Sequence, residues 1–335
     1  MSTTLRAGIS GALGMTFVGG SVAASGMLAD APLHTAQALR YAVACALLVA
    51  WARATRRRLR RPRGAEWLWL IGVAISGLVV FNVALVHGSR HAEPAVLAVG
   101  VACVPVALAA IGPLLEGRSP RARVLTAAVV VSVGAVVVEG FGRADAVGLA
   151  WAVTVFVCEA GFTLLAVPVL GRLGPVGVSV HTTWIAAAMF AILALRIEGI
   201  SAATTFDGDD LLAIGYLAVG VTALAFILWY SCVHSLGSGR AGLLTGVAPI
   251  AAAAIGVPVT GALPDPAVWA GVTLIALGLT IGLVSVPRAG TRPDADGTAP
   301  SSHASRISPT PRTTARRRDC LSPLESRSTV DSHRS

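Results

Sequence analysis

One stretch of the sequence occurs twice, 144 positions apart and without a gap, and this repeat limits the folds that the chain can adopt. Each copy has an apolar run, a short turn with a proline and a second apolar run, which predicts a helical hairpin. A match at a fixed spacing indicates an internal duplication. The matching residues are Pro105, Ala107, Ala109, Ala110, Ile111, Gly112, Gly117, Pro120, Val124 and Gly134, then Pro249, Ala251, Ala253, Ala254, Ile255, Gly256, Gly261, Pro264, Val268 and Gly278.

Corresponding loops of the two copies differ in charge. The turn of the first hairpin carries Arg118, Arg121 and Arg123, where the second has Ala262, Asp265 and Ala267. The run from Arg53 to Arg63 is likewise matched by a loop with Asp207, Asp209 and Asp210. Cytoplasmic loops of membrane proteins are enriched in arginine and lysine. We therefore expect the two halves to cross the membrane in opposite orientations.

Composition places the chain in a membrane. It is 55% hydrophobic and 13% charged, whereas a soluble domain carries about 25% charged residues. Apolar runs recur at about the 20 residues that span a bilayer as a helix. The expected spans are Ile9–Leu28, Leu33–Trp51, Trp67–Val86, Pro94–Leu115, Val124–Val138, Val147–Leu170, Val178–Leu195, Leu211–Tyr230, Ala241–Val259 and Ala267–Val286.

The sequence thus predicts an all-α polytopic membrane protein with ten transmembrane helices in two inverted five-helix repeats. The first repeat covers residues 1–140 and the second 147–286. Residues 287–335 are rich in Ser, Thr, Pro and Arg, and we expect them to form a disordered cytoplasmic tail, since they can bury little apolar surface. With both termini cytoplasmic in the cell membrane, 13 arginines fall in inner loops and three in outer loops.

The net charge of +9 does not indicate a nucleic-acid partner, because no aromatic residues interleave with the arginine runs. The five cysteines are scattered and form no CxxC pair, so we expect no metal site and no disulfide framework. No Walker motif is present. We expect no cofactor. The expected partners are a small-molecule substrate and membrane lipid.

Several short motifs resemble those of the EamA family of the drug/metabolite transporter superfamily. Leu39–Ala44 reads L-R-Y-A-V-A, Leu115-Glu116 closes the fourth span, and Gly134 lies in the fifth. The resemblance covers about Gly8 to Val286. It implies two inverted repeats around a central cavity through which small metabolites or drugs pass by alternating access, commonly as export. One departure is Thr260, where the second repeat of the family would carry the glutamate.

Two ionisable residues inside expected spans are candidates for substrate binding or coupling, since a charge in hydrocarbon is costly. Glu159 lies about 12 residues, or roughly 18 Å, into the sixth span. It could carry a proton or hold a cationic group, or it could be a hydrogen-bonded carboxyl between helices. Arg40 in the second span could hold a substrate carboxylate or pair with Glu159. It could also snorkel outward or bind backbone carbonyls.

Asn82 in the third span and Trp184 in the seventh are further candidates for cavity lining. Helix packing and interface anchoring are the alternative interpretations of these two residues. No residue is expected to be catalytic, because the outer loops are short and their polar residues are sparse. The longest offers Asp207, Asp209 and Asp210 without a histidine.

We therefore expect a secondary transporter, not an enzyme, that exports a small metabolite or drug, with coupling to protons as a possible energy source. A lipid or nucleotide-sugar carrier and a membrane-embedded enzyme are the alternatives.

Overall fold

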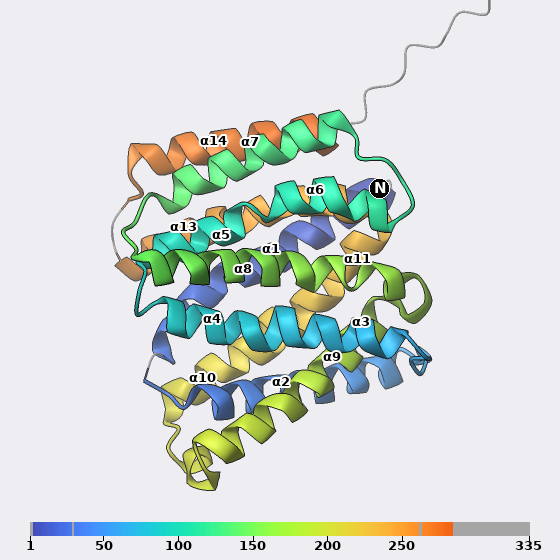
Figure 1. The fold of residues 1–335 in the computed structure, drawn as a ribbon, viewed down its shortest axis with the longest axis vertical. Coiled ribbons are helices and arrows are strands. Elements are labelled where there is room, and N and C mark those ends of the chain that lie inside the picture. Colours follow the sequence, from blue (N-terminus) through green and yellow to red (C-terminus); the bar gives the residue numbers. More distant parts are fainter. Residues whose placement is uncertain (1–2, 29, 261–262, 284–335) are drawn as a thin grey trace, which may run out of the picture. The chain divides into compact units, whose positions relative to one another are not determined.

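The computed structural model describes residues 3–28, 30–260 and 263–283, and these form ten helical spans (Figure 1). Within these ranges there is no strand, only an isolated bridge between Ala92 and Ala144. The predicted all-α membrane fold with ten spans is confirmed, while the predicted tail of residues 287–335 lies outside the described residues. The spans are α1 (Thr3–Met27), α2 (Leu33–Ala54), α3–η1–α4 (Glu66–Val73, Ala74–Val80, Phe81–Gly88), α5–α6 (Pro94–Ala102, Val104–Leu115), α7 (Ala122–Glu139), α8 (Ala146–Leu164), α9 (Val167–Ile197), α10–η3–α11 (Gly208–Tyr216, Leu217–Leu224, Ala225–Leu236), α12–η4–α13 (Ser238–Gly242, Leu243–Gly246, Val247–Thr260) and α14 (Pro266–Leu283).

Prolines and glycines divide several of these spans. The expected sixth span, Val147–Leu170, ends earlier, at Leu164, and α9 begins at Val167 with Pro168 in its first turn. Proline has no N–H to donate and its ring clashes with the carbonyl four residues earlier, so the helix breaks there. Within α9, Gly174 has a φ of 71° and kinks the helix before Pro175. Pro105 similarly follows the break between α5 and α6 at Cys103.

The third and eighth spans each contain a π-helical segment at a corresponding place. The segments η1 and η3 start 143 positions apart, at Ala74 and Leu217, and end 144 apart, at Val80 and Leu224. Each holds a glycine that receives an aromatic ring. A Cβ on Gly77 would meet Phe162 of α8, and a Cβ on Gly220 would meet Phe17 of α1. The two halves therefore share this local packing, although neither π-helix could be predicted from the sequence.

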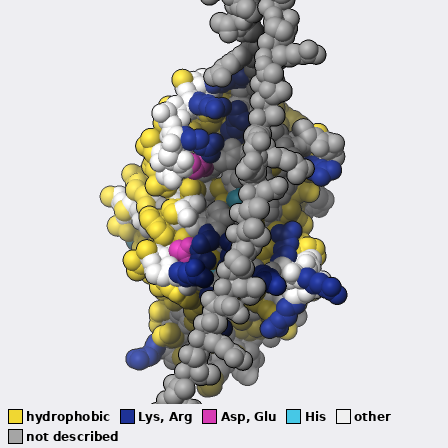
Figure 2. Space-filling view, turned by 90° about the vertical axis from the view of Figure 1, so that its right-hand side faces the viewer, with side chains coloured by type: hydrophobic (Ala, Val, Ile, Leu, Met, Phe, Trp, Pro, Cys, Tyr) yellow, Lys and Arg dark blue, Asp and Glu magenta, His cyan; other side chains and the backbone are white. Residues whose placement is uncertain are grey.

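Polar contacts sort the connecting loops into two ends of the bundle. At one end, Arg172 pairs with Glu66, and Glu116 accepts hydrogen bonds from the backbone N–H and the hydroxyl of Ser238 at 2.6 and 2.7 Å. At the other end, Arg143 pairs with Glu93 at 3.0 Å. We call the first the arginine end and the second the acidic end. The charged residues of the arginine end are Arg6, Arg53, Arg56, Arg57, Arg58, Arg60, Arg61, Arg63, Arg118, Arg121, Arg123, Arg172, Arg240, Glu66 and Glu116. Those of the acidic end are Asp30, Glu93, Glu139, Asp145, Glu198, Asp207, Asp209, Asp210, Asp265, Arg90, Arg143 and Arg196. Figure 2 looks onto the arginine end and shows basic side chains spread across it.

Helices α2 and α9 run antiparallel. The start of α2 contacts the residue after α9, through His34 and Glu198, while Arg60 beyond the end of α2 contacts the carbonyl of Arg172 near the start of α9. The arginine run Arg53–Arg63 and the acidic loop with Asp207 therefore lie at opposite ends of the bundle. Two of these acidic residues act locally: Asp207 and Asp210 form a capping box at the start of α10.

Candidate substrate-binding site

Glu159 lies on the interior side of α8. At 100° per residue, it is roughly opposite Val153 and Val157, which are 62% and 57% exposed and mark the outer face of this helix. The Glu159 side chain is half-buried and makes no hydrogen bond or ion pair with any described residue. Among the described residues, the only fully enclosed side-chain polar atom without a partner is Ser132 Oγ. The carboxylate oxygens of Glu159 therefore keep some accessible surface.

The segment of α8 that follows Glu159 is bound to α11 by two hydrogen bonds. One turn further along α8, Thr163 Oγ1 accepts a bond from the indole N–H of Trp229 at 2.9 Å, and the hydroxyl of Tyr230 donates to the carbonyl of Phe162 at 3.1 Å. Phe162, Phe226 and Tyr230 pack with ring centroids 4.9 to 6.3 Å apart. The face of α8 that carries Glu159 is thus held rigidly, which keeps the carboxylate in a fixed place.

Arg40 is buried in the interior and does not pair with Glu159. Its Nε donates to Thr222 Oγ1 of η3 at 2.9 Å, and one terminal nitrogen donates to Gln37 Oε1 at 3.3 Å. No carboxylate among the described residues neutralises the guanidinium, which has five N–H donors. An Arg40–Glu159 pair, one of the alternatives that the sequence left open, is absent from the described contacts. Arg40 therefore keeps both its charge and spare donors for another acceptor.

Tyr41 links three of the four predicted residues. The guanidinium carbon of Arg40 lies 5.1 Å from the Tyr41 ring centroid, and Asn82 Nδ2 donates to the Tyr41 hydroxyl at 3.1 Å. Glu159 is within electrostatic range of the same hydroxyl. Asn82 also donates to the carbonyl of Leu78 at 2.6 Å, inside η1. Arg40 and Asn82 therefore contact one buried tyrosine, and Glu159 interacts with it electrostatically.

Trp184 lies elsewhere. Its ring is 41% exposed on α9, and its indole N–H donates to His181 Nδ1 at 3.2 Å. The Trp67 ring packs edge-on against it, 6.0 Å between centroids. The structure thus brings Trp184 together with the aromatic residues of the arginine end and not with Arg40, Asn82 and Glu159.

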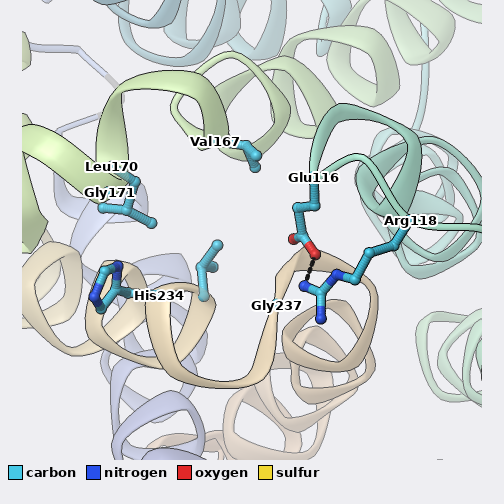
Figure 3. A pocket seen from close by; sticks show the side chains of 8 residues that line it. Glu116, Arg118, Val167, Leu170, Gly171, His234 and Gly237 are labelled. Carbon is cyan, nitrogen blue, oxygen red and sulfur yellow. Dashed lines mark hydrogen bonds and ion pairs between the residues drawn. The ribbon is translucent and has the colours of Figure 1, made fainter.

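A pocket of about 190 Å³ opens at the arginine end (Figure 3). Glu116 and Arg118 lie on one side of it and Leu170, Gly171 and His234 on the other. Arg118 pairs with Glu116 beside this pocket. Glu116 also caps α12 through Ser238, so it joins the fourth and ninth spans. Within the described ranges, no three His, Cys, Asp or Glu side chains are placed to hold a metal ion.

Comparisons with known proteins identify the family of this chain. The sequence profile of the EamA-like transporter family matches residues 6–139 and again residues 146–284. This chain belongs to the EamA-like transporter family. It is 22% identical over 257 residues to the "Uncharacterized transporter YetK" of Bacillus subtilis (strain 168), an alignment that covers 73% of this chain and 76% of that protein.

A protein of known crystal structure also shares the fold of this EamA-like chain. The two superpose with a TM-score of 0.69 at 21% identity, covering 84% of this chain and 97% of the other. At this level of identity the similarity concerns the fold alone. Together with the ten helical spans, family membership makes this EamA-like chain a multi-pass membrane transporter.

Two contributors to the EamA-like site, Tyr41 and Thr222, were missed in the sequence, and so was Glu198, which joins two spans outside the site. Tyr41 follows Arg40 directly, Thr222 lies in an apolar run, and Glu198 follows a helix end. Only Tyr41 had a local signal, since it shares the L-R-Y-A-V-A motif with Arg40. Thr222 contacts Arg40 across 182 positions of sequence, and no local pattern indicates such a contact.

Thr222→Val is expected to destabilise the protein because the buried Nε of Arg40 then loses its acceptor. A buried charged donor without a partner costs about 1–3 kcal/mol. Thr182→Val is the matched control, because Thr182 is equally buried and bonds only to carbonyls of its own helix. Thermal unfolding in detergent should show a clearly larger loss for Thr222→Val. Equal losses in the two variants would contradict a specific role for Thr222.

Glu198 ties the seventh span to the second at the acidic end. Its carboxylate accepts hydrogen bonds from the backbone N–H groups of His34 and Thr35 at 2.8 and 2.9 Å and from the Thr35 hydroxyl at 2.6 Å, and it pairs with the His34 ring at 2.8 Å. Burial by itself raises the pKa of Glu198, but the hydrogen bonds from Thr35 and His34 outweigh it and hold the pKa below its ordinary value.

This lowered pKa predicts a pH-dependent contact. A carboxyl whose pKa is lower in the folded protein stabilises the fold above its unfolded pKa, about 4.3 for glutamate, and this stabilisation is lost as the pH falls through the folded pKa. As the pH is lowered from 7, the thermal midpoint of wild type should therefore fall more steeply than the thermal midpoint of Glu198→Gln. Parallel pH curves for the two proteins would count against the contact.

Proposed function

We propose that this chain is a secondary transporter that moves a small metabolite or drug across the cytoplasmic membrane by alternating access. Two observations carry the proposal: the buried guanidinium of Arg40 is neutralised by no described carboxylate, and the carboxylate of Glu159, within a span, has no described bonding partner. Polar groups with spare bonding capacity in a helix bundle are costly unless a ligand or an ion uses them. The family and its Bacillus subtilis relative point to transport and not to catalysis.

We further propose that residues 1–140 and 147–286 are inverted repeats. Three observations support this. The profile matches twice, the helices α7 and α14 begin 144 positions apart, and the arginine run and the acidic loop lie at opposite ends of the bundle. Transporters built from inverted repeats hold their substrate near the repeat interface and expose it to each side in turn.

The charge distribution supports an orientation in which the arginine end is cytoplasmic. Gly11 of α1 packs against Cys232 near the end of α11, while Gly20 packs against Tyr216 at the other end of the eighth span. The chain therefore enters the bundle at the arginine end, so the amino terminus is cytoplasmic in this orientation. An even number of spans places the carboxyl terminus on the same side. We propose export as the direction and a proton carried by Glu159 as the coupling ion.

The test is a tolerance screen of cells that overproduce the protein, against a panel of toxic metabolites and drugs. The expected result is raised tolerance to at least one compound, with less of that compound accumulated in the cells. The same compound should be transported by purified protein in vesicles. A protein that changes neither tolerance nor accumulation for any compound, and moves none in vesicles, would refute the proposal.

A further inference from the structure

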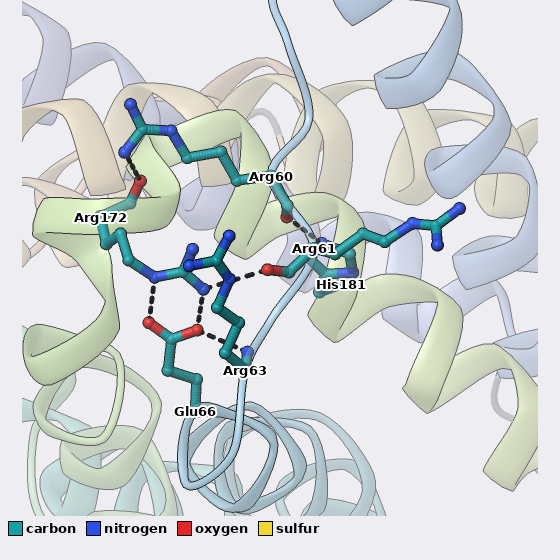
Figure 4. Close-up of polar contacts among 6 residues, drawn as sticks. All are labelled: Arg60, Arg61, Arg63, Glu66, Arg172 and His181. Atoms are coloured by element: carbon teal, nitrogen blue, oxygen red, sulfur yellow. Dashed lines mark hydrogen bonds and ion pairs between the residues drawn. The ribbon is translucent and has the colours of Figure 1, made fainter. Parts of the chain in front are cut away.

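The loop Arg53–Arg63, here named the arginine loop, is held firmly by its backbone. The carbonyl of Arg60 accepts a hydrogen bond from His181 Nε2 at 3.1 Å, and the carbonyl of Arg61 accepts one from Arg172 at 3.0 Å (Figure 4). The N–H of Arg63 donates to Glu66 at 2.8 Å. Pro62 is buried and Leu59 packs against a hydrophobic cluster. The loop is therefore a fixed platform on α3 and α9.

The arginine side chains of this platform remain almost entirely unpaired. All seven are exposed, and only Arg60 donates a side-chain bond, to the carbonyl of Arg172 at 3.2 Å. The two carboxylates that the structure describes at this end are already engaged: Glu66 by Arg172 and Glu116 by Arg118. No described acidic group is left to neutralise the arginine loop, so its counterions come from outside the described residues.

An aromatic cluster lies directly beside the platform. His181, which holds the loop through Nε2, accepts the indole N–H of Trp184 on Nδ1 at 3.2 Å, and the Trp67 ring packs 6.0 Å from both. Trp184 and Leu68 are 41% and 73% exposed on the outer faces of α9 and α3. Figure 4 shows the Arg61 side chain extending past His181, away from the Glu66–Arg172 pair.

We propose that the arginine loop and this aromatic cluster form a binding site for an anionic phospholipid. The phosphate is held by unpaired guanidinium groups of Arg57, Arg58 and Arg61, because guanidinium binds phosphate oxygens in pairs of charge-assisted bonds. The glycerol and upper acyl region lie against Trp184 and Leu68, since indole rings favour the level of the headgroups.

This site goes beyond the rule that places arginines in cytoplasmic loops. That rule requires positive charge in the loop, but it requires neither a backbone fixed to two helices nor exposed aromatic rings next to it. An anionic surface attracts a polybasic segment without such order. The fixed geometry indicates that one lipid is recognised, and the lipid would then brace the second, third and seventh spans together.

The test measures bound lipid on the full chain in detergent. Native mass spectrometry and thermal unfolding are performed with phosphatidylglycerol and with phosphatidylcholine of the same acyl chains. Phosphatidylglycerol should be retained and should raise the thermal midpoint, and phosphatidylcholine should do neither. In the triple variant Arg57→Gln, Arg58→Gln, Arg61→Gln, the affinity for phosphatidylglycerol should fall by about tenfold or more.

The control is a second triple variant, Arg6→Gln, Arg121→Gln, Arg123→Gln, which removes the same charge from exposed, unpaired positions at the same end. It should retain the lipid. Trp184→Ala, at an exposed position, should also weaken retention. Equal losses in both triple variants would show attraction to charge alone and overturn the site. If soluble glycerol phosphate raises the thermal midpoint as much as phosphatidylglycerol does, the occupant of the site is not a lipid.

Discussion

Glu159→Gln is expected to reduce proton-coupled transport to the level of protein-free vesicles. Glutamine keeps the size and the hydrogen-bonding capacity of the side chain, but it cannot take up or release a proton. Glu159 is the one acidic residue in the middle of a described span, and it has no bonding partner among the described residues. The measurement is solute flux in vesicles with an imposed pH gradient, together with the pH change inside them.

Glu139→Gln is the matched control for this prediction. Glu139 ends α7 at the acidic end, so the same substitution changes a carboxyl outside the interior site. It should leave the flux and its dependence on the gradient unchanged. If Glu159→Gln also leaves both unchanged, Glu159 is not the coupling group, although transport of another kind would still be possible. Exchange of solute without a gradient separates these two outcomes.

Adding a methyl group at the crossing of α7 and α14 is expected to cost the most stability. A Cβ on Gly134 would lie 2.8 Å from the carbonyl oxygen of Gly271 and from the backbone nitrogen of Ile275. A Cβ on Gly271 would lie 2.6 Å from the carbonyl oxygen of Gly134. Backbone atoms cannot rotate away, so the two helices would have to separate along their contact. Small residues allow such close approach between helices in membranes.

Gly134→Ala and Gly271→Ala should each lower stability by about 1–3 kcal/mol, the usual cost of overpacking. Gly215→Ala is the control, since Gly215 also lies in a helix but a Cβ there would meet no atom within 4 Å. It should be neutral or slightly stabilising, because alanine favours helix over glycine by up to about 1 kcal/mol. Thermal unfolding and yield of folded protein measure the effect. Similar stability of all three variants would contradict this packing.

Several elements followed directly from local patterns in the sequence. The expected third and fifth spans agree with the structure to within two residues at each end, and the fourth, Pro94–Leu115, has the same outer bounds. Each apolar run is long enough to cross a bilayer, and charges or prolines mark its ends. The division of spans was less predictable. The proline that ends α8 was visible at Pro168, but a π-helix depends on the packing of Phe162 against Gly77 from another span.

The candidate site was predicted only in part. Glu159 and Arg40 stand out because ionisable residues are rare in apolar runs, and Asn82 stands out for the same reason. Their actual partners, Thr222 and Tyr41 among them, could not be identified, because a polar residue within a helix gives no sign of which distant helix it meets. Trp184 illustrates the limit: it lies on an expected span, yet its ring faces outward beside Trp67.

By itself, the sequence determined that this chain crosses a membrane ten times, because the length and polarity of each run decide whether a segment can be buried in lipid. It also determined the charge difference between the two ends, since arginine and aspartate are distributed by loop. The tertiary structure alone decided that Arg40 binds Thr222 and not Glu159, and that Trp184 faces outward beside Trp67. Those outcomes depend on how helices distant in sequence pack together, and side-chain contacts between them arise only when the whole bundle forms.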